Sequence, residues 1–255
     1  MSAPSESSAP EEAQLSIAGL VKTSLVDYPG QLCTTLFFRG CNLRCPYCHN
    51  RGLVLGDGLA SPLSGEGAIG FLAGRRHLVD AVCLSGGEPT LVPSLPRLAA
   101  TLKRLGLKVK LDTNGTRPAV IRDLLQTGAV DYVAMDIKAP LPKYEFVARA
   151  SVNLDDIRAT VALLQQGGVE YEFRTTVVPG LLTREDLLAI GDWLAGAKTY
   201  VLQQFRPRST LDEAYERVRP YADEWLHAVA EALRPAFGEV RVRGAGQAGS
   251  TARRA

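Results

Sequence analysis

Hydrophobic positions along the chain follow two alternating patterns. Short apolar runs rich in β-branched residues have the length of strands, and longer stretches repeat their apolar residues every three or four positions, as amphipathic helices do. Strand and helix in regular alternation are typical of βαβ units and a parallel sheet. The short runs predict strands at Leu32–Phe38, Ala81–Ser85, Leu107–Asp112, Tyr132–Ile137, Val169–Val178 and Tyr200–Gln204, with Val240–Val242 as a seventh candidate.

Helices are expected between these strands, with boundaries marked by local chemistry. Glycines such as Gly106 and Gly128 follow the periodic stretches as stop signals, and Thr183 with Asp186 forms a capping pattern. The expected helices are Leu95–Leu105, Ala119–Gln126, Leu154–Gln166, Thr183–Leu194 and Tyr221–Leu233. About six βα units imply an α/β fold whose parallel sheet curls into a full or partial barrel or stays open and doubly wound. In each case ligands bind at the carboxyl ends of the strands.

The length of 255 residues fits one α/β domain, and 46% hydrophobic with 22% charged residues is usual for a globular protein. The first residues are rich in Ser, Ala, Pro and Glu, and the last are rich in Gly and Ala. We therefore expect disordered tails at 1–14 and 244–255 around one domain at 15–243.

Charge and hydropathy exclude two classes of partner. The formal charge of +2, from 29 basic and 27 acidic residues, is too balanced for a nucleic-acid binder. No apolar stretch reaches the length of about 18 residues that crosses a bilayer, and the amino terminus has no secretory pattern. We expect no nucleic-acid or membrane partner and a cytoplasmic location.

Unusual polar motifs follow the predicted strands, where each strand ends. Because the carboxyl ends of parallel strands meet at one rim, these motifs predict a single active site. They are the cysteine-rich stretch 39–50, Ser85-Gly86-Gly87-Glu88-Pro89-Thr90, Asp112-Thr113-Asn114-Gly115, Met135-Asp136-Ile137-Lys138 and Val177-Val178-Pro179-Gly180.

Three of the five cysteines, Cys41, Cys45 and Cys48, lie within eight residues. This spacing suits three corners of an iron–sulfur cube, and the missing fourth thiolate leaves one iron open to a substrate. The alternatives are a structural zinc site with His49 as fourth ligand, or an electron-carrier module. Cys33 and Cys83 lie inside apolar strands, where we expect them to act as small hydrophobic residues.

The other motifs also have plain structural interpretations. Gly-Gly-Glu-Pro alone forms a strand-to-helix turn, and Asp-Thr-Asn-Gly alone forms an Asx-type turn. Asp136 and Lys138, two residues apart on a strand, share a face and point into the barrel, either as a buried ion pair or as ligand contacts. Desolvating two charges is costly, which favours a function for this pair.

The spacing C-x3-C-x2-C, with the aromatic Tyr47 before the last cysteine, resembles the signature of the radical S-adenosylmethionine (SAM) superfamily. Further motifs resemble its branch of glycyl-radical-enzyme activating proteins, above all those for anaerobic ribonucleoside-triphosphate reductase, from about Ile17 to Arg243. These motifs are His49-Asn50, the stretch Ser24–Gly30, Leu111–Gly115, Met135–Lys138, Tyr171–Gly180 and Leu202–Phe205.

This resemblance implies a partial (β/α)6 barrel that carries one [4Fe-4S] cluster on Cys41, Cys45 and Cys48, with SAM chelated to the open iron. Gly86 and Gly87 would let the backbone approach the ligand, and Glu88 would accept a hydrogen bond from the methionyl ammonium. The expected SAM contacts are Tyr47, Ser85, Gly86, Gly87, Glu88, Asp112, Thr113, Asn114, Asp136 and Lys138.

The implied reaction is reductive cleavage of SAM to a 5′-deoxyadenosyl radical, which removes hydrogen from a glycine of anaerobic ribonucleoside-triphosphate reductase. An electron donor such as flavodoxin or ferredoxin is a second implied partner, and Arg174 with Leu202–Phe205 would guide the loop of the target. The alternatives are activation of pyruvate formate-lyase or modification of a small molecule such as a deazapurine precursor. Unlike some members of the branch, the chain has no histidine in Leu181–Leu194.

Overall fold

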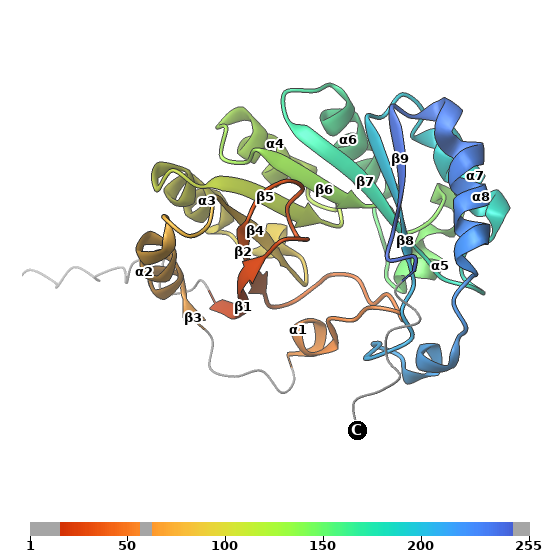
Figure 1. The fold of residues 1–255 in the computed structure, drawn as a ribbon, viewed down its shortest axis with the longest axis horizontal. Helices are drawn as coiled ribbons and strands as arrows, with labels where there is room; N and C mark the ends of the chain where they lie inside the picture. Colours follow the sequence, from red (N-terminus) through yellow and green to blue (C-terminus); the bar gives the residue numbers. More distant parts are fainter. Residues whose placement is uncertain (1–15, 57–62, 247–255) are drawn as a thin grey trace, which may run out of the picture.

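The computed structural model describes residues 16–56 and 63–246. Within these ranges, nine strands form one curved sheet in the order β3-β1-β2-β4-β5-β6-β7-β8-β9 (Figure 1). Seven strands are parallel: β2 (Cys33–Phe38), β4 (Ala81–Gly86), β5 (Lys108–Thr113), β6 (Tyr132–Asp136), β7 (Glu170–Val177), β8 (Thr199–Gln204) and β9 (Glu239–Arg243). They confirm the predicted strands, including the seventh.

Helices line the outer side of this sheet in a row, and most neighbours in the row contact one another (Figure 1). The long ones are α2 (Gly65–Arg75), α3 (Leu95–Arg104), α4 (Pro118–Gln126), α6 (Leu154–Gln165), α7 (Arg184–Trp193) and α8 (Asp223–Leu233). One covered face distinguishes a partial barrel from a doubly wound sheet, which carries helices on both faces. Six βα units followed by β9 confirm the expected α/β partial barrel.

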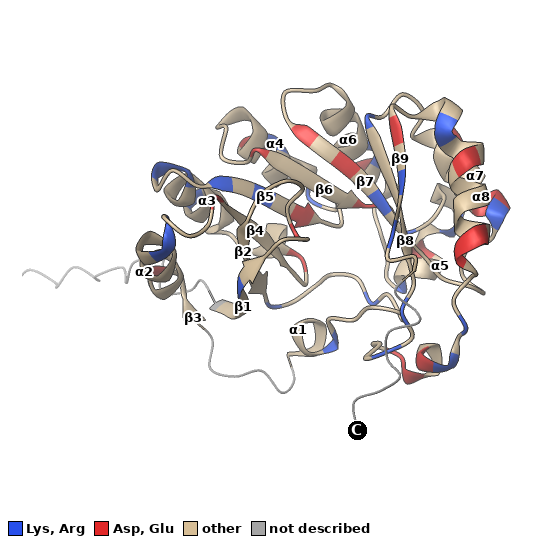
Figure 2. Cartoon of the chain, viewed as in Figure 1, with Lys and Arg blue, Asp and Glu red and all other residues tan. Residues whose placement is uncertain are grey.

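Side chains on the two faces of the strands have opposite character. On β2, the outward residues Leu36 and Phe38 are fully buried against the helices. On α3, Leu95, Leu98, Ala99 and Leu102 recur at helical spacing and are buried in the same core. The inner face is polar instead, and Figure 2 shows acidic and basic segments following one another along β7 and β9. A charged interior indicates a barrel that is built to hold a polar ligand.

The predicted helix limits agree with the structure to within about two residues. The capping pattern of α7 is formed: Thr183 Oγ1 accepts a hydrogen bond from Asp186 N, and Asp186 Oδ2 accepts one from Thr183 N. Such a cap fixes where α7 begins and therefore where β7 and its following turn end.

Several elements lacked a clear sequence signal. The antiparallel strands β1 (Ser16–Ser24) and β3 (Leu63–Ser64) extend the sheet beyond β2. The segment of α2 reads GEGAIGFLAGR, and its glycines lower helix propensity by up to about 1 kcal/mol each. Two short helices, α1 (Arg51–Leu55) and α5 (Tyr144–Ala148), are too short to show a period.

The predicted domain ends at Arg243, which is also the last residue of β9. The first residues of the expected tail, 244–246, form a turn in which Gly246 N donates to Asp223 Oδ2 at 2.6 Å. Residues 1–14 and 247–255, the rest of the two expected tails, lie outside the described residues. In the described part of the chain, no helix has the length and apolar character needed to span a membrane.

Candidate active site

A cavity of about 440 Å³ lies at the carboxyl ends of the parallel strands. Every residue predicted to hold the cluster or SAM lines it: Cys41, Cys45, Tyr47, Cys48, Ser85, Gly86, Gly87, Glu88, Asp112, Thr113, Asn114, Asp136 and Lys138. The structure adds eight residues that the site prediction did not include: Asp27, Leu43, His49, Asn50, Val54, Arg174, Thr176 and Gln203. All of these except Val54 belong to motifs that the sequence had singled out.

The cysteines occupy a loop, residues 39–50, that follows β2 and is fixed by backbone hydrogen bonds from three directions. Gly40 N donates to Leu53 O, Arg44 N to Ala148 O and Asp212 N to Pro46 O, each at 2.9 Å. These partners lie in or beside α1, α5 and the segment after β8. Segments distant in sequence therefore hold the cysteine loop over the cavity.

Burial controls the chemistry of these thiols. It raises the pKa of Cys41, and it raises the pKa of Cys45 to about 11. A buried thiol stays protonated unless a cation stabilises the thiolate, and a coordinated metal does so outright. The raised pKa values of Cys41 and Cys45 fit thiols that ionise when iron coordinates them.

The two glycines after β4 are required by contact between backbones rather than by a ligand. Gly86 has φ +126°, and a Cβ there would lie 2.4 Å from Phe38 N. A Cβ on Gly87 would lie 1.9 Å from Gly40 O. Gly87 N and Glu88 N donate to Phe38 O and Gly40 O, at 3.0 and 2.8 Å. The expected close approach exists, but it joins the turn to the start of the cysteine loop.

Glu88, predicted to accept a hydrogen bond from the methionyl ammonium, accepts hydrogen bonds from three neighbouring residues. It is fully buried, and its Oε1 accepts hydrogen bonds from Thr113 Oγ1 at 2.8 Å and from Thr90 N at 3.1 Å. Its Oε2 accepts from Asn114 N at 2.6 Å. Burial outweighs these bonds and raises the pKa of Glu88. The carboxyl group thus fastens the end of β4 to the end of β5.

Asn114 extends this connection to the cysteines. Its Nδ2 donates to Asn42 Oδ1 at 2.9 Å and lies 3.8 Å from Cys41 Sγ, while its Oδ1 accepts from Thr116 N at 3.1 Å. The Asx turn foreseen for this motif is present, and it also orients the loop that carries Cys41. Thr113 and Asn114 therefore act mainly on the protein itself in this structure.

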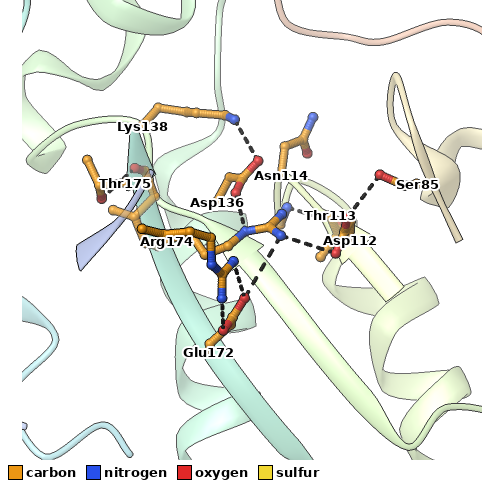
Figure 3. Close-up of polar contacts among 12 residues, drawn as sticks. Ser85, Asp112, Thr113, Asn114, Asp136, Lys138, Glu172, Arg174 and Thr175 are labelled. Carbon is orange, nitrogen blue, oxygen red and sulfur yellow. Dashed lines mark hydrogen bonds and ion pairs between the residues drawn. The ribbon is translucent and has the colours of Figure 1, made fainter. Parts of the chain in front are cut away.

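Charged side chains from neighbouring strands meet on the inner face of the sheet (Figure 3). Arg174 on β7 donates from Nε to Asp136 Oδ1 at 2.8 Å and from Nη1 to Asp112 Oδ1 at 3.3 Å. Lys138 Nζ donates to Asp136 Oδ2 at 3.1 Å, as expected from their shared face. Ser85 Oγ donates to Asp112 Oδ2 at 2.9 Å. This ion network joins β4, β5, β6 and β7.

Arg174 is therefore a central member of the ion network, with a side chain only 10% exposed, and it also lines the cavity. Burial opposes the negative charge of Asp136. The positive charges of Arg174 and Lys138 outweigh this effect and lower the pKa of Asp136 to about 2. Burial likewise opposes the charge of Lys138, yet Asp136 raises the Lys138 pKa. The pair is ionised across the physiological range.

A second ion pair lies deeper in the barrel. Arg243 on β9 donates to both oxygens of the fully buried Glu172 on β7, at 3.1 and 3.0 Å (Figure 3). Tyr132 Oη also donates to Glu172 Oε2, at 3.2 Å. Glu172 lies in the motif Tyr171–Gly180, but neither Glu172 nor Arg243 was predicted as a site residue.

The zinc alternative needs His49 as a fourth ligand. His49 Nε2 lies 2.8 Å from Arg206 O, and its ring stacks on Phe205 with centroids 6.4 Å apart. Among the described residues, no three His, Cys, Asp or Glu side chains are placed around one metal-ion position. An iron–sulfur cube needs no such common point, because each thiolate binds a different iron.

Comparison with known proteins connects this cavity with a family. The sequence profile described as the radical SAM superfamily matches residues 35–194, which include the cysteine loop and β2 to α7. The chain belongs to the radical SAM superfamily. As a radical SAM protein it is an enzyme that uses a [4Fe-4S] cluster and SAM, as the sequence predicted.

Relatives of this radical SAM enzyme carry related names. A protein of Methanocaldococcus jannaschii named as a glycyl-radical enzyme activating enzyme is 31% identical, over 89% of this chain and 95% of its own. The pyruvate formate-lyase-activating enzyme of Streptococcus mutans is 29% identical, over 77% of this chain and 80% of its own.

Solved structures agree on the fold. The Streptococcus suis protein SuiB bound to its precursor peptide SuiA superimposes with a TM-score of 0.66 at 13% identity. The match covers 82% of this chain, which spans about half the length of SuiB.

Proposed function

We propose that this protein is an activase that installs a glycyl radical on anaerobic ribonucleoside-triphosphate reductase. The observation that carries the proposal is the shared cavity, in which one buried and two partly buried thiols face an ionised network on strand ends. When bound, the cluster and SAM supply one-electron cleavage of the S–C5′ bond and so a carbon radical that removes hydrogen.

The residues divide this work between them. Cys41, Cys45 and Cys48 hold the cluster, and Tyr47, buried at the cavity wall, keeps water from it. The ionised Asp136 and Lys138 suit the ammonium and carboxylate of a methionyl group, with Asp112 and Ser85 beside them. Gly86, Gly87, Glu88, Thr113 and Asn114 position the cysteine loop against these groups.

A protein as the target explains why the barrel is partial. Among the described strands, β3 and β9 are the two ends of the sheet, so the barrel has an open side through which a loop of another protein can enter. The choice of the reductase rests on the motifs Asp27-Tyr28-Pro29-Gly30 and Leu202-Gln203-Gln204-Phe205. An acidic one-electron donor such as flavodoxin or ferredoxin would reduce the cluster in the cytoplasm.

Activation of pyruvate formate-lyase is the second candidate. Two activating enzymes for this lyase, from Streptococcus mutans and Clostridium pasteurianum, match 77% and 79% of the chain at 29% and 28% identity. The same cavity serves either target, because hydrogen removal from a glycine is the same reaction in both.

Electron paramagnetic resonance distinguishes the two targets. The reconstituted protein is incubated anaerobically with a strong reductant, SAM and either the reductase or the lyase. We expect a doublet, from the single remaining α-hydrogen, on the reductase. Deuterating its glycines should collapse the splitting and place deuterium in 5′-deoxyadenosine.

A doublet on the lyase alone would assign the second candidate. Cleavage of SAM with no radical on either protein would contradict both, and would favour modification of a small molecule.

A further inference from the structure

The cavity has two chemically different sides. Below β4, β5 and β6 its polar side chains, charged and neutral, are bonded to other residues of the protein, as in the network of Asp112, Asp136 and Lys138. Toward β7 and β8, beside the network residue Arg174, it is lined by two neutral polar residues, Thr176 and Gln203. In Figure 1 these two strands lie on the side of the sheet away from α2 and β3.

Thr176 and Gln203 are neighbours across the two strands. The register of the parallel pair sets Thr176 directly opposite Gln203, and both side chains line the cavity. Within the described part of the chain, neither side chain forms a hydrogen bond to another residue. Their donors and acceptors are therefore free for a ligand.

The residues next to them in sequence behave in the opposite way. Thr175 Oγ1 donates to Ile137 O at 2.9 Å and accepts from Tyr200 Oη at 2.8 Å. Gln204 Nε2 donates to Tyr221 O at 2.8 Å and to Asp223 Oδ1 at 3.0 Å, toward α8. The outward Thr and Gln are thus used for folding, whereas the inward Thr and Gln are not.

The free carboxamide of Gln203 closely matches the hydrogen-bonding groups of a peptide unit. The Gln side chain offers both a donor and an acceptor, as a peptide unit does, and a Thr hydroxyl can add either. A target whose reacting residue is glycine has no side chain at that point, so its backbone is the main feature that can be recognised there. A neutral pair also suits a neutral backbone, whereas the charged side of the cavity suits the charged methionyl group.

We propose that Thr176 and Gln203 form an amide clamp that binds the backbone of the target segment beside its radical glycine. This inference rests on the proposed function and assigns the target-binding part of the cavity. The pair positions the target. The competing occupant is the nucleoside part of SAM, which the test must separate from the peptide.

The experiment measures two affinities on the cluster-loaded protein by anaerobic calorimetry. One ligand is SAM, and the other is a synthetic peptide that spans the radical glycine of the target, titrated with SAM present. Gln203→Met and Thr176→Val remove the hydrogen-bonding groups at nearly constant volume. Gln204→Met and Thr175→Val are the matched controls from the outward face of the same strands.

For Gln203→Met and Thr176→Val, we expect the affinity for the peptide to fall about tenfold and the affinity for SAM to change less than about twofold. The outward controls should lower the melting temperature while leaving the peptide affinity near that of the wild type. If the inward variants weaken SAM as much as peptide, the pair belongs to the SAM site and the inference is overturned.

A second series changes the peptide rather than the protein. Replacing one amide next to the glycine by an ester removes a single N–H and should weaken binding to the wild type about tenfold. The same ester should cost little in Gln203→Met, because the partner of that N–H is already gone. Equal losses in both proteins would overturn the clamp.

Failure of the proposed function has a different signature. In that case the wild-type protein neither binds the peptide nor produces the doublet with reductase or lyase. The amide clamp is then overturned together with the proposed function. A wild-type doublet together with unchanged peptide affinity in Gln203→Met would overturn the clamp alone.

Discussion

Individual residues of similar chemistry have different roles here because their surroundings differ. Cys45 and Cys83 are both buried thiols with raised pKa, yet only Cys45 lines the cavity. Cys83 packs with Cys33, Ala81 and Tyr28 in a separate apolar cluster. Burial alone therefore does not identify a ligand, and the position at a strand end does.

The first prediction tests this difference. Alanine at Cys41, Cys45 or Cys48 should abolish the bound cluster, measured as iron content and visible absorption after anaerobic reconstitution. Cys33→Ser and Cys83→Ser should retain the cluster and lose at most about 1–3 kcal/mol of stability, because each exchanges a buried thiol for a smaller and more polar hydroxyl. Full iron content in Cys45→Ala would show that the ligand set is wrong.

At the scale of elements, the strand-to-helix turn after β4 packs against the cysteine loop and holds it in place. Two backbone hydrogen bonds and the absence of two Cβ atoms let this turn lie directly against Phe38 and Gly40. Asn50 reinforces the contact by donating from Nδ2 to Gly86 O at 2.8 Å. The loop geometry therefore depends on a neighbouring element as much as on its own sequence.

Gly87→Ala is expected to break the contact between this turn and the cysteine loop. Its Cβ would overlap Gly40 O, an atom of backbone that cannot rotate away, so we expect a loss of more than about 2 kcal/mol and a reduced iron content. Gly74→Ala in α2 is the control, since its Cβ meets nothing within 4 Å and should be neutral or stabilising by about 0.5–1 kcal/mol. Thermal unfolding and iron analysis measure both. Normal cluster loading in Gly87→Ala would show that this contact does not position the cysteine loop.

At the scale of the whole molecule, the ion network ties together strands that the backbone ladder already joins. Arg174 on β7 reaches Asp112 on β5 across β6, and Ser85 continues the network to β4. The inner face of the barrel is thus stabilised by charge where other α/β barrels use branched apolar side chains. Its stability should depend on pH accordingly.

The pKa of Asp136 gives the direction of this dependence. The pKa is lowered to about 2 in the folded protein from an ordinary value near 4, so its stabilisation is complete above about pH 4 and is lost as the pH falls toward 2. We expect wild-type protein to exceed Asp136→Asn in unfolding free energy by a constant amount of about 1–2 kcal/mol above pH 4, shrinking below it. Denaturant titrations of the cluster-free proteins at several pH values measure the difference. A difference that grows on acidification would refute the assignment.

The sequence by itself determined the seven parallel strands, five of the six long helices, the single rim of polar motifs and the three cysteines, because periodicity, capping and ligand spacing are properties of near neighbours. The antiparallel strands β1 and β3, the glycine-rich helix α2 and the short helices were not predicted, since glycines weaken a helical pattern and a few residues show no period. Only the tertiary structure decided what the rim residues contact: Glu88 and Asn114 hold the cysteine loop, Arg174 lies inside the network, and Gln203 faces the cavity while Gln204 faces α8. Those contacts join residues far apart in the chain, and the curvature and register of the sheet bring them together.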